Sequence, residues 1–335
     1  MNTAKMSQET KMEEPITDKQ SNVVSTAGKD ANGAKSTLTV GQIAAICFPA
    51  GVAGALAIVL FSQILAQFGL VAKGPIPFPI QFHSPGIYQP LFWGGLWGIL
   101  FGLFVKAAWK RLYLVGLLYV LAPLLATFLF FLPKGGAGFF GLEQSGPMFP
   151  LYVLLVNVPF GIVTAWAAKA IIDAGGAEQR QREVSTMESD SKAINSDLTV
   201  SQHAALGFAA GVIGAAAVVA CSYVLFGLGI SGALGVKAPL PLKSPDIYKP
   251  LFWGGLWGIL FGLFIKTAWK RLYLIGFLYV LAPLLALFLF FLPMGGAGFF
   301  GLNKGPTFTL YLLLVNLPFG IVTALTARAI IGKHP

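Results

Sequence analysis

The sequence predicts an all-α polytopic membrane protein of eight transmembrane helices, arranged as two parallel four-helix repeats. Three observations lead to this prediction. Hydrophobic residues make up 56% of the 335 residues and charged residues only 11%, against about 25% in an ordinary soluble domain. Charge-free stretches long enough to cross a membrane recur along the chain, and its second half repeats the first. This composition excludes a soluble enzyme, a disordered chain and a nucleic-acid binder.

The polar parts of the chain are confined to two segments. Residues 1–36 carry balanced charge, lack the apolar run of a signal peptide and are expected to form a disordered cytoplasmic tail. Residues 173–197 are predicted to form a polar, partly helical cytoplasmic linker. Together these segments carry 8 basic and 11 acidic residues, and the remaining residues carry 15 basic and 2 acidic ones. The net charge of +10 therefore belongs to the hydrophobic blocks.

The two predicted repeats are residues 37–172 and 198–335. A helix needs about 20 apolar residues to cross a bilayer, and on this basis each repeat holds four spans. They are expected at 42–68, 90–108, 112–133 and 149–172, and at 202–228, 250–268, 272–293 and 308–331. Because each unit has an even number of spans, both copies enter the membrane in the same direction.

The strength of the repeat varies along the chain. Residues 88–142 match 248–302 at 48 of 55 positions, and residues 146–172 match 305–331 at 20 of 27. Residues 38–87 match 198–247 at only 21 of 50. The near-identity of the central part is compatible with functional constraint and with recent duplication.

Lys and Arg placement predicts the orientation. The side with both termini, the linker and the turns at 106–111 and 266–271 carries 17 basic residues, and the opposite side carries 6. Because basic loops stay in the cytoplasm, both termini are predicted to be cytoplasmic. The two turns hold duplicated clusters, which either fix topology or bind anionic lipid or solute: Lys106, Lys110 and Arg111, and Lys266, Lys270 and Arg271.

Small residues line one face of the second span in each repeat. They recur every four residues, at Gly94, Gly98 and Gly102 and at Gly254, Gly258 and Gly262. Such spacing lets helix backbones approach closely. The faces are interpreted as packing surfaces, with a conduit wall as the alternative, and the two glycine-faced helices are expected to meet near the pseudo-twofold axis.

Prolines and polar residues recur in the third and fourth spans. Pro123 and Pro283 release the carbonyls of Tyr119 and Tyr279 from helical hydrogen bonding, because each proline lacks the N–H that would reach four residues back. The fourth spans contain Asn157 before Pro159 and Asn316 before Pro318, with Thr164 and Thr323 two turns later. Each Asn is expected either to cap its own kinked helix or to form part of a midplane binding site.

Several kinds of chemistry have no support in the sequence. No histidine is duplicated, so haem or metal ligation is not expected, and we expect no cofactor. No carboxylate lies inside a predicted span, which disfavours proton coupling and leaves sodium coupling open. With no nucleophile elbow or phosphate-binding loop, an enzyme is not expected.

A loop motif suggests a family. GAGFFGL is followed by a Gly-Pro pair and by an apolar span with a central polar residue and a Phe-Gly pair, in both halves. This order resembles small uncharacterised bacterial four-span integral membrane protein families. The resemblance covers residues 146–172 with the preceding loop, and their counterparts. It implies a multi-pass protein of the bacterial cell inner membrane and supplies no catalytic residues. The loops themselves, 133–148 and 293–307, are expected to be interfacial or re-entrant turns.

Two functional classes remain open. The first is a transporter or channel for a neutral or anionic small solute, bound near Asn157, Asn316, Thr164, Thr323, Tyr119 and Tyr279. The second is a non-catalytic membrane scaffold or accessory subunit whose glycine faces bind partner helices. The expected partners are the lipid bilayer, a small solute and anionic lipid, and no nucleic acid.

Overall fold

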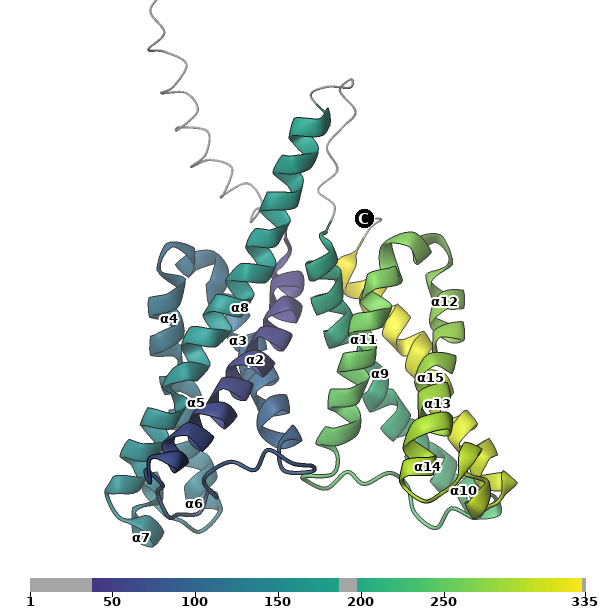
Figure 1. Ribbon diagram of the computed structural model, residues 1–335, viewed down its shortest axis with the longest axis horizontal. Helices are drawn as coiled ribbons and strands as arrows, with labels where there is room; N and C mark the ends of the chain where they lie inside the picture. The colour runs from purple at the N-terminus through teal and green to yellow at the C-terminus, as the bar shows by residue number, and fades with distance from the viewer. Residues whose placement is uncertain (1–37, 187–197, 333–335) are drawn as a thin grey trace, which may run out of the picture.

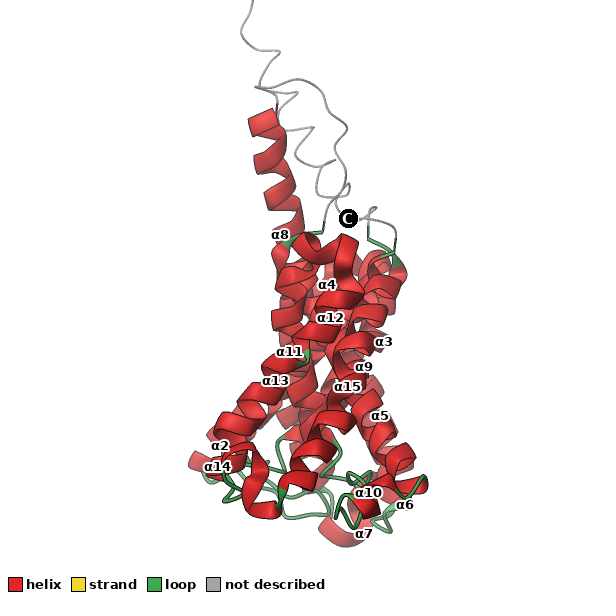
Figure 2. Ribbon diagram, turned by 90° about the vertical axis from the view of Figure 1, so that its right-hand side faces the viewer, coloured by secondary structure: helices red, strands yellow, loops and turns green. Residues whose placement is uncertain are grey.

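The computed structural model describes residues 38–186 and 198–332, and these residues are helical throughout apart from connecting loops (Figures 1 and 2). Six helical segments among them are long and apolar enough to cross a membrane. They are Val40–Gln67, Tyr88–Lys134, Met148–Ala174, Val200–Gly227, Tyr248–Met294 and Pro306–Ile331. The predicted all-α class and multi-pass membrane character are confirmed. The predicted tail, 1–36, lies outside the described residues.

Two of the six segments, at matching positions, are 47 residues long and bent. The first comprises α3 (Tyr88–Ala108), a 3-10 turn (Trp109–Arg111), α4 (Leu112–Tyr119), α5 (Leu121–Ala126), a π-helical turn (Thr127–Phe131) and α6 (Leu132–Lys134). The second comprises α11 (Tyr248–Ala268), a 3-10 turn (Trp269–Arg271), α12 (Leu272–Tyr279), α13 (Leu281–Ala286), a π-helical turn (Leu287–Phe291) and α14 (Leu292–Met294). Each covers two of the eight predicted spans, and the chain turns back at the 3-10 turn (Figure 1).

The remaining long helices are continuous, and all but α9 contain a proline. They are α2 (Val40–Gln67), α8 (Met148–Thr186), α9 (Val200–Gly227) and α15 (Pro306–Ile331). Short helices lie in the loops at the lower end of the molecule in Figure 1: η3 (Phe139–Gly141), α7 (Leu142–Ser145), α10 (Ile230–Ala233) and η6 (Phe299–Lys304). The helix α8 continues into the predicted linker as far as Thr186, so the first part of that segment is helical.

The central helices are α2 and α9. More than half of the most apolar window of each is buried, 56% and 61%, against 28% and 22% in the two bent segments. The bent segments are therefore the more exposed parts, although their first arms, α3 and α11, pack against the central helices. Both central helices begin with a capping box, in which Thr39 and Gln42, and Thr199 and Gln202, exchange hydrogen bonds between side chain and backbone.

The glycine faces pack inside each half. A Cβ added to Gly98 of α3 would collide with the carbonyl oxygen of Cys47 in α2 and would lie 2.8 Å from the Cα of Gly51. Gly258 of α11 meets Gly207 and Gly211 of α9 in the same way. The two glycine-faced helices, α3 and α11, do meet where the halves join, as expected, but through aromatic side chains. Their glycine faces are occupied by the first helix of each half.

Glycines also set the contacts of α8. Gly54 of α2 leaves room for Thr164 and the carbonyl oxygen of Phe160. On another side of α8, Gly161 and Gly116 of α4 approach so closely that a Cβ on either would strike the other's carbonyl oxygen. Gly214, Gly276 and Gly320 repeat these contacts in the second half. Each half is thus held by three close backbone approaches.

The two halves meet through aromatic rings. Phe48 of α2 packs on Phe208 of α9 with ring centroids 5.6 Å apart. Near the lower ends of α3 and α11, the indole Nε1 of Trp93 donates to the hydroxyl of Tyr248 at 3.1 Å, and that of Trp253 donates to Tyr88 at 3.3 Å. The contact is reciprocal, as expected where two similar units meet about a twofold axis.

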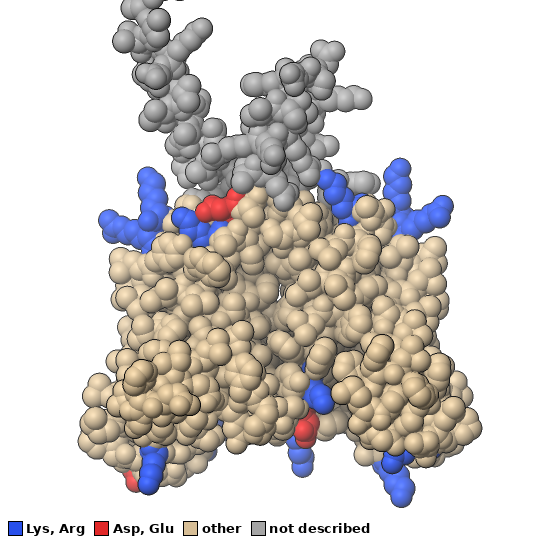
Figure 3. All heavy atoms as spheres, viewed as in Figure 1, with Lys and Arg blue, Asp and Glu red and all other residues tan. Residues whose placement is uncertain are grey.

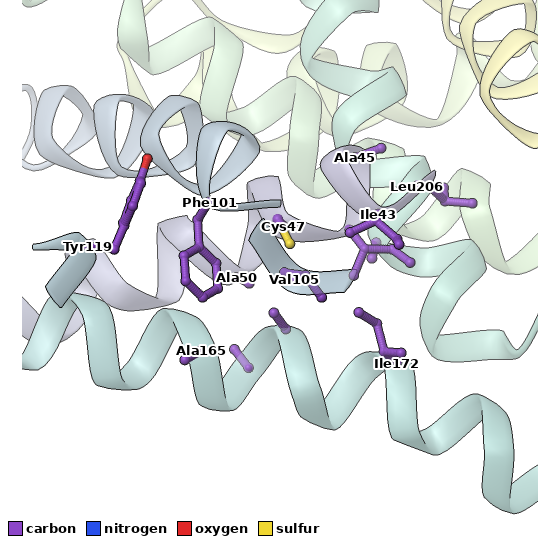
Figure 4. Close-up of a cluster of buried hydrophobic side chains, with 14 of the residues drawn as sticks. Ile43, Ala45, Cys47, Ala50, Phe101, Val105, Tyr119, Ala165, Ile172 and Leu206 are labelled. Atoms are coloured by element: carbon purple, nitrogen blue, oxygen red, sulfur yellow. The ribbon is translucent and has the colours of Figure 1, made fainter. Parts of the chain in front are cut away.

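The core is continuous across this junction. Phe101 and Val105 of α3 pack with Cys47 of α2 and Ala165 of α8, and Leu206 of α9 joins the same cluster (Figure 4). The polar link at the upper end is Gln42, whose Nε2 donates to the carbonyl oxygen of Ile331 at 3.1 Å. The largest apolar cluster among the described residues therefore contains residues of both halves.

Replacing Gly98 with Ala is expected to destabilise the protein by about 1–3 kcal/mol, the usual cost of overpacking a tight contact. The reason is that α2 must move away from α3 to admit the methyl group. Gly227→Ala is the matched control, because this helical glycine has open space around its Cβ position. Thermal unfolding of the full chain in detergent measures both. Equal midpoints for the two variants would contradict this account of the crossing.

Candidate functional site

The two Asn residues of the fourth spans bond to their own helices. Nδ2 of Asn157 donates to the carbonyl oxygen of Val153 at 2.7 Å, and Nδ2 of Asn316 donates to that of Leu312 at 2.8 Å. Both amides are partly buried, and their side-chain oxygens accept no hydrogen bond from the described residues. Each amide thus has one satisfied donor and an unused acceptor beside a proline.

The prolines lie inside these helices without breaking them. Pro159 is within α8 and Pro318 within α15. Since proline has no N–H, Pro159 leaves the carbonyl of Leu155 without its helical donor. The Asn157 amide donates to the carbonyl oxygen of Val153. It therefore does not replace the missing donor at the carbonyl of Leu155. Polar acceptors therefore accumulate at the same level of each fourth span.

The threonines are part of the helix packing. Thr164 and Thr323 are fully buried against Gly54 and Gly214. The hydroxyl of Thr323 donates to the carbonyl oxygen of Phe319 at 2.7 Å, whereas Thr164 Oγ1 has no partner among the described residues. Thr164 lies between α8 and α2, and Thr323 lies between α15 and α9. Both threonines therefore contribute to packing between these helices.

The tyrosines tie the bent segments together. The hydroxyl of Tyr119 donates to the carbonyl oxygen of Trp97 at 2.7 Å, and that of Tyr279 donates to Trp257 at 2.6 Å. Tyr119 also packs on Phe101 with ring centroids 5.3 Å apart. Both bonds connect the third predicted span to the second, so these hydroxyls hold the two arms of each bent segment against one another.

The kinks at Pro123 and Pro283 have a local structure that the sequence did not predict. The helix is interrupted at Val120 and Val280, and a π-helical turn follows four residues after each proline. Thr127 Oγ1 donates to the carbonyl oxygen of Pro123 at 2.8 Å, whereas Leu287 replaces this threonine in the second half. Single π-helical turns are frequent at functional sites, and the only sequence signal for these two is the proline before them.

Sequence reasoning also missed a role for two serines. Ser62 donates to the carbonyl oxygen of Val59 at 2.7 Å and accepts from the N–H of Ile80 at 3.2 Å. Ser222 makes the equivalent pair of bonds to Val219 and Leu240. These hydroxyls fasten the loop after each central helix to that helix, and the retention of a serine in both repeats was the available signal.

The charged groups lie at the two ends of the molecule. Figure 3 shows Lys and Arg at the upper and lower rims, separated by a band without charges. The side chains of Lys106, Lys110 and Arg111 are exposed, as are those of Lys266, Lys270 and Arg271. Among residues 38–186 and 198–332, no three His, Cys, Asp or Glu side chains group in a way that could hold a metal ion.

The fold and these contacts define a polytopic integral membrane protein of the all-α class, in which two bent apolar segments occupy matching positions. No family model matches the chain, and neither a curated protein nor a solved structure is similar to it. The resemblance noted for its loop motif therefore stays a prediction.

Replacing Tyr279 with Phe removes one hydroxyl-to-carbonyl bond without removing the ring. We expect a loss of about 0.6 kcal/mol, the average for such bonds in membrane helices, seen as earlier thermal unfolding in detergent. Tyr223→Phe is the control, since the Tyr223 hydroxyl bonds to none of the described residues. If both substitutions leave the unfolding midpoint unchanged, the tie between α11 and α12 contributes nothing to stability.

Proposed function

We propose that each 47-residue bent segment crosses the membrane twice, which gives eight crossings in two parallel halves. A straight helix of 47 residues would be about 70 Å long, more than twice the hydrocarbon thickness of about 30 Å. The chain turns back at Trp109–Arg111 and at Trp269–Arg271, where Lys and Arg residues cluster. Basic turns stay in the cytoplasm, so both termini belong on that side, and the loop motif adds a bacterial inner membrane.

We further propose that the protein is a transporter or channel for a neutral or anionic small solute. The observation that carries this proposal is the pair of partly buried Asn amides, each with an unused oxygen beside a proline in the middle of an apolar helix. An unpaired polar group in hydrocarbon is costly. A water-filled path or a polar solute would satisfy both amides at equivalent levels of the two halves, as in transporters built from repeats.

The chemistry of the solute follows from the residues that the spans contain. Amides, hydroxyls and released carbonyls dominate, and no carboxylate lies in a predicted span. Such groups bind neutral molecules that donate hydrogen bonds, and the second N–H of each Asn amide is the donor that an anion would use. The hydroxyls of Tyr119, Tyr279 and Thr323 donate to backbone carbonyls. We therefore limit the proposed site to the two Asn residues and the proline kinks beside them. We propose no enzymatic activity.

The contacts of the glycine faces weigh against the alternative, a scaffold or accessory subunit. That function would need these faces to be open to partner helices. They are instead filled by α2 and α9, and a Cβ at Gly94, Gly98, Gly254 or Gly258 would strike the backbone or side chains of those helices.

Accessibility labelling tests the eight crossings. In a background with Cys47 and Cys221 replaced by Ala, we expect Gln89→Cys and Lys134→Cys to be labelled from one side of the membrane. Lys110→Cys should be labelled from the other side, because the turn separates the two arms. Labelling of Gln89→Cys and Lys134→Cys from opposite faces would mean that the segment crosses once, and would overturn this topology.

Replacing both Asn157 and Asn316 with Ala should abolish or strongly reduce solute uptake, because the site would lose its amides. Uptake is measured in liposomes containing the purified full chain, with neutral and anionic solutes identified by screening. Asn303→Ala is the control, since Asn303 is exposed and bonds to Gly296 in a loop. Uptake by the double variant equal to that of the control would rule out this site. An absence of any flux through the parent protein would favour the scaffold.

A further inference from the structure

The upper rim in Figure 3 carries basic residues above an uncharged band, and in the second half it also has a built arrangement of rings and cations. The guanidinium of Arg328 in α15 lies over the rings of Tyr273 and Trp269, at 5.1 and 5.9 Å from their centroids. Trp269 is buried, and Tyr273 is 42% exposed. The two rings therefore form a wall that fixes the position of the Arg328 head group.

Stacking of this kind uses the face of the guanidinium and leaves its N–H edge available. That edge presents donors in a rigid fork whose geometry matches two oxygens of a phosphate. Lys270 and Arg271 are exposed and adjoin Trp269 in the chain, so they add charge to the same turn. The cluster formed by Trp269, Lys270, Arg271, Tyr273 and Arg328 thus combines an oriented fork with neighbouring cations.

Residues 198–332 supply this cluster with no nearby carboxylate. Asp246 is the sole acidic residue of 198–332, and it precedes α11, a helix of 21 residues whose far end bears the cluster. Such a helix is about 30 Å long. The positive charge of the cluster is consequently not neutralised by a side-chain carboxylate of residues 198–332, and the site is suited to an external anion.

The first half differs at one decisive position. Its equivalent cation is Lys169, which lies over Trp109 and Tyr113 at 5.6 and 5.8 Å and pairs with Asp173 at 3.8 Å. The residue aligned with Asp173 in the second half is Gly332. Among the described residues, an internal carboxylate therefore competes with an external anion at the first-half cation and not at Arg328. Lysine also lacks the planar fork that Arg328 provides.

We propose that the second-half cluster binds the phosphate headgroup of an anionic phospholipid, and that the first-half cluster binds it more weakly. A free phosphate would satisfy the same donors, but the surface below the cluster favours a lipid. Exposed apolar residues continue from Tyr273 down α12 and into α13, including Leu274 at 52%, Phe277 at 46% and Leu281 at 51% exposure. Acyl chains can lie along this surface while the headgroup contacts the basic turn.

The test uses the full chain in detergent, with lipid binding measured by native mass spectrometry and by thermal stabilisation. Phosphatidylglycerol is the probe, phosphatidylcholine is the neutral lipid, and inorganic phosphate is the competitor. Each basic residue near a membrane surface contributes about fivefold to binding of anionic lipid. We expect Arg328→Gln to weaken binding of phosphatidylglycerol by about fivefold, and Arg328→Lys by less, because charge remains without the fork.

Lys304→Gln is the matched control, because it removes the same charge from an exposed residue at the opposite end. Asp173→Asn provides a second, opposite test, because it should strengthen binding to the first half by releasing Lys169.

The proposal is overturned if Arg328→Gln and Lys304→Gln bind phosphatidylglycerol equally, or if phosphatidylcholine binds as tightly as phosphatidylglycerol. Full displacement of the lipid by inorganic phosphate would assign the site to a free anion instead. Lipid binding is measured independently of solute uptake, so this experiment tests the lipid site separately from the transport proposal.

Discussion

The structure depends on the close approach of the first two helices in each half. Gly51, Gly98 and the backbone of Cys47 lie so near one another that no Cβ fits between α2 and α3, and Gly211 and Gly258 repeat this between α9 and α11. In a bilayer the lipid tails are as apolar as the side chains, so association relies on dispersion contacts and therefore on how closely backbones approach. The glycine crossings supply that contact, and they place α2 and α9 at the centre.

The remaining helices are arranged around these crossings, and several of their polar side chains bond to backbone groups, as the hydrocarbon favours. Tyr119 and Tyr279 donate to carbonyls of α3 and α11, and Ser62 and Ser222 hold the loops that follow the central helices. The amides of Asn157 and Asn316 stand out because each retains an unused oxygen. The fourth spans also hold the buried hydroxyls of Tyr152, Thr164 and Tyr311, which have no hydrogen-bond partner among the described residues.

Much of the fold could be predicted because it depends on local composition. Apolar length gives the helices, basic turns mark the reversals, and Gly94, Gly98 and Gly102 mark a packing face. What the glycines pack against could not be predicted, because periodicity identifies a face and not its partner. The hydroxyls of Tyr119 and Thr164 were likewise grouped with Asn157 from their spacing along the chain. The structure assigns them to contacts with other helices, which one-dimensional spacing does not encode.

The uneven similarity of the two halves has a partial physical explanation. Tyr88 and Trp93 bond reciprocally with Trp253 and Tyr248, so this contact requires the same residue types in both copies. It accounts for identity at the start of the near-identical segment and not for the 55 positions as a whole. The central helices keep the residues of their own repeated contacts, Phe48 with Phe208 and Gly51 with Gly211, and differ at other positions. Cys47 fills space beside Gly102 in the first half, whereas Gly207 replaces it in the second and lets the backbones of α9 and α11 come together there. Two halves with one architecture can therefore differ at their centre, and the pairing of Asp173 with Lys169 shows that they differ at their rim as well.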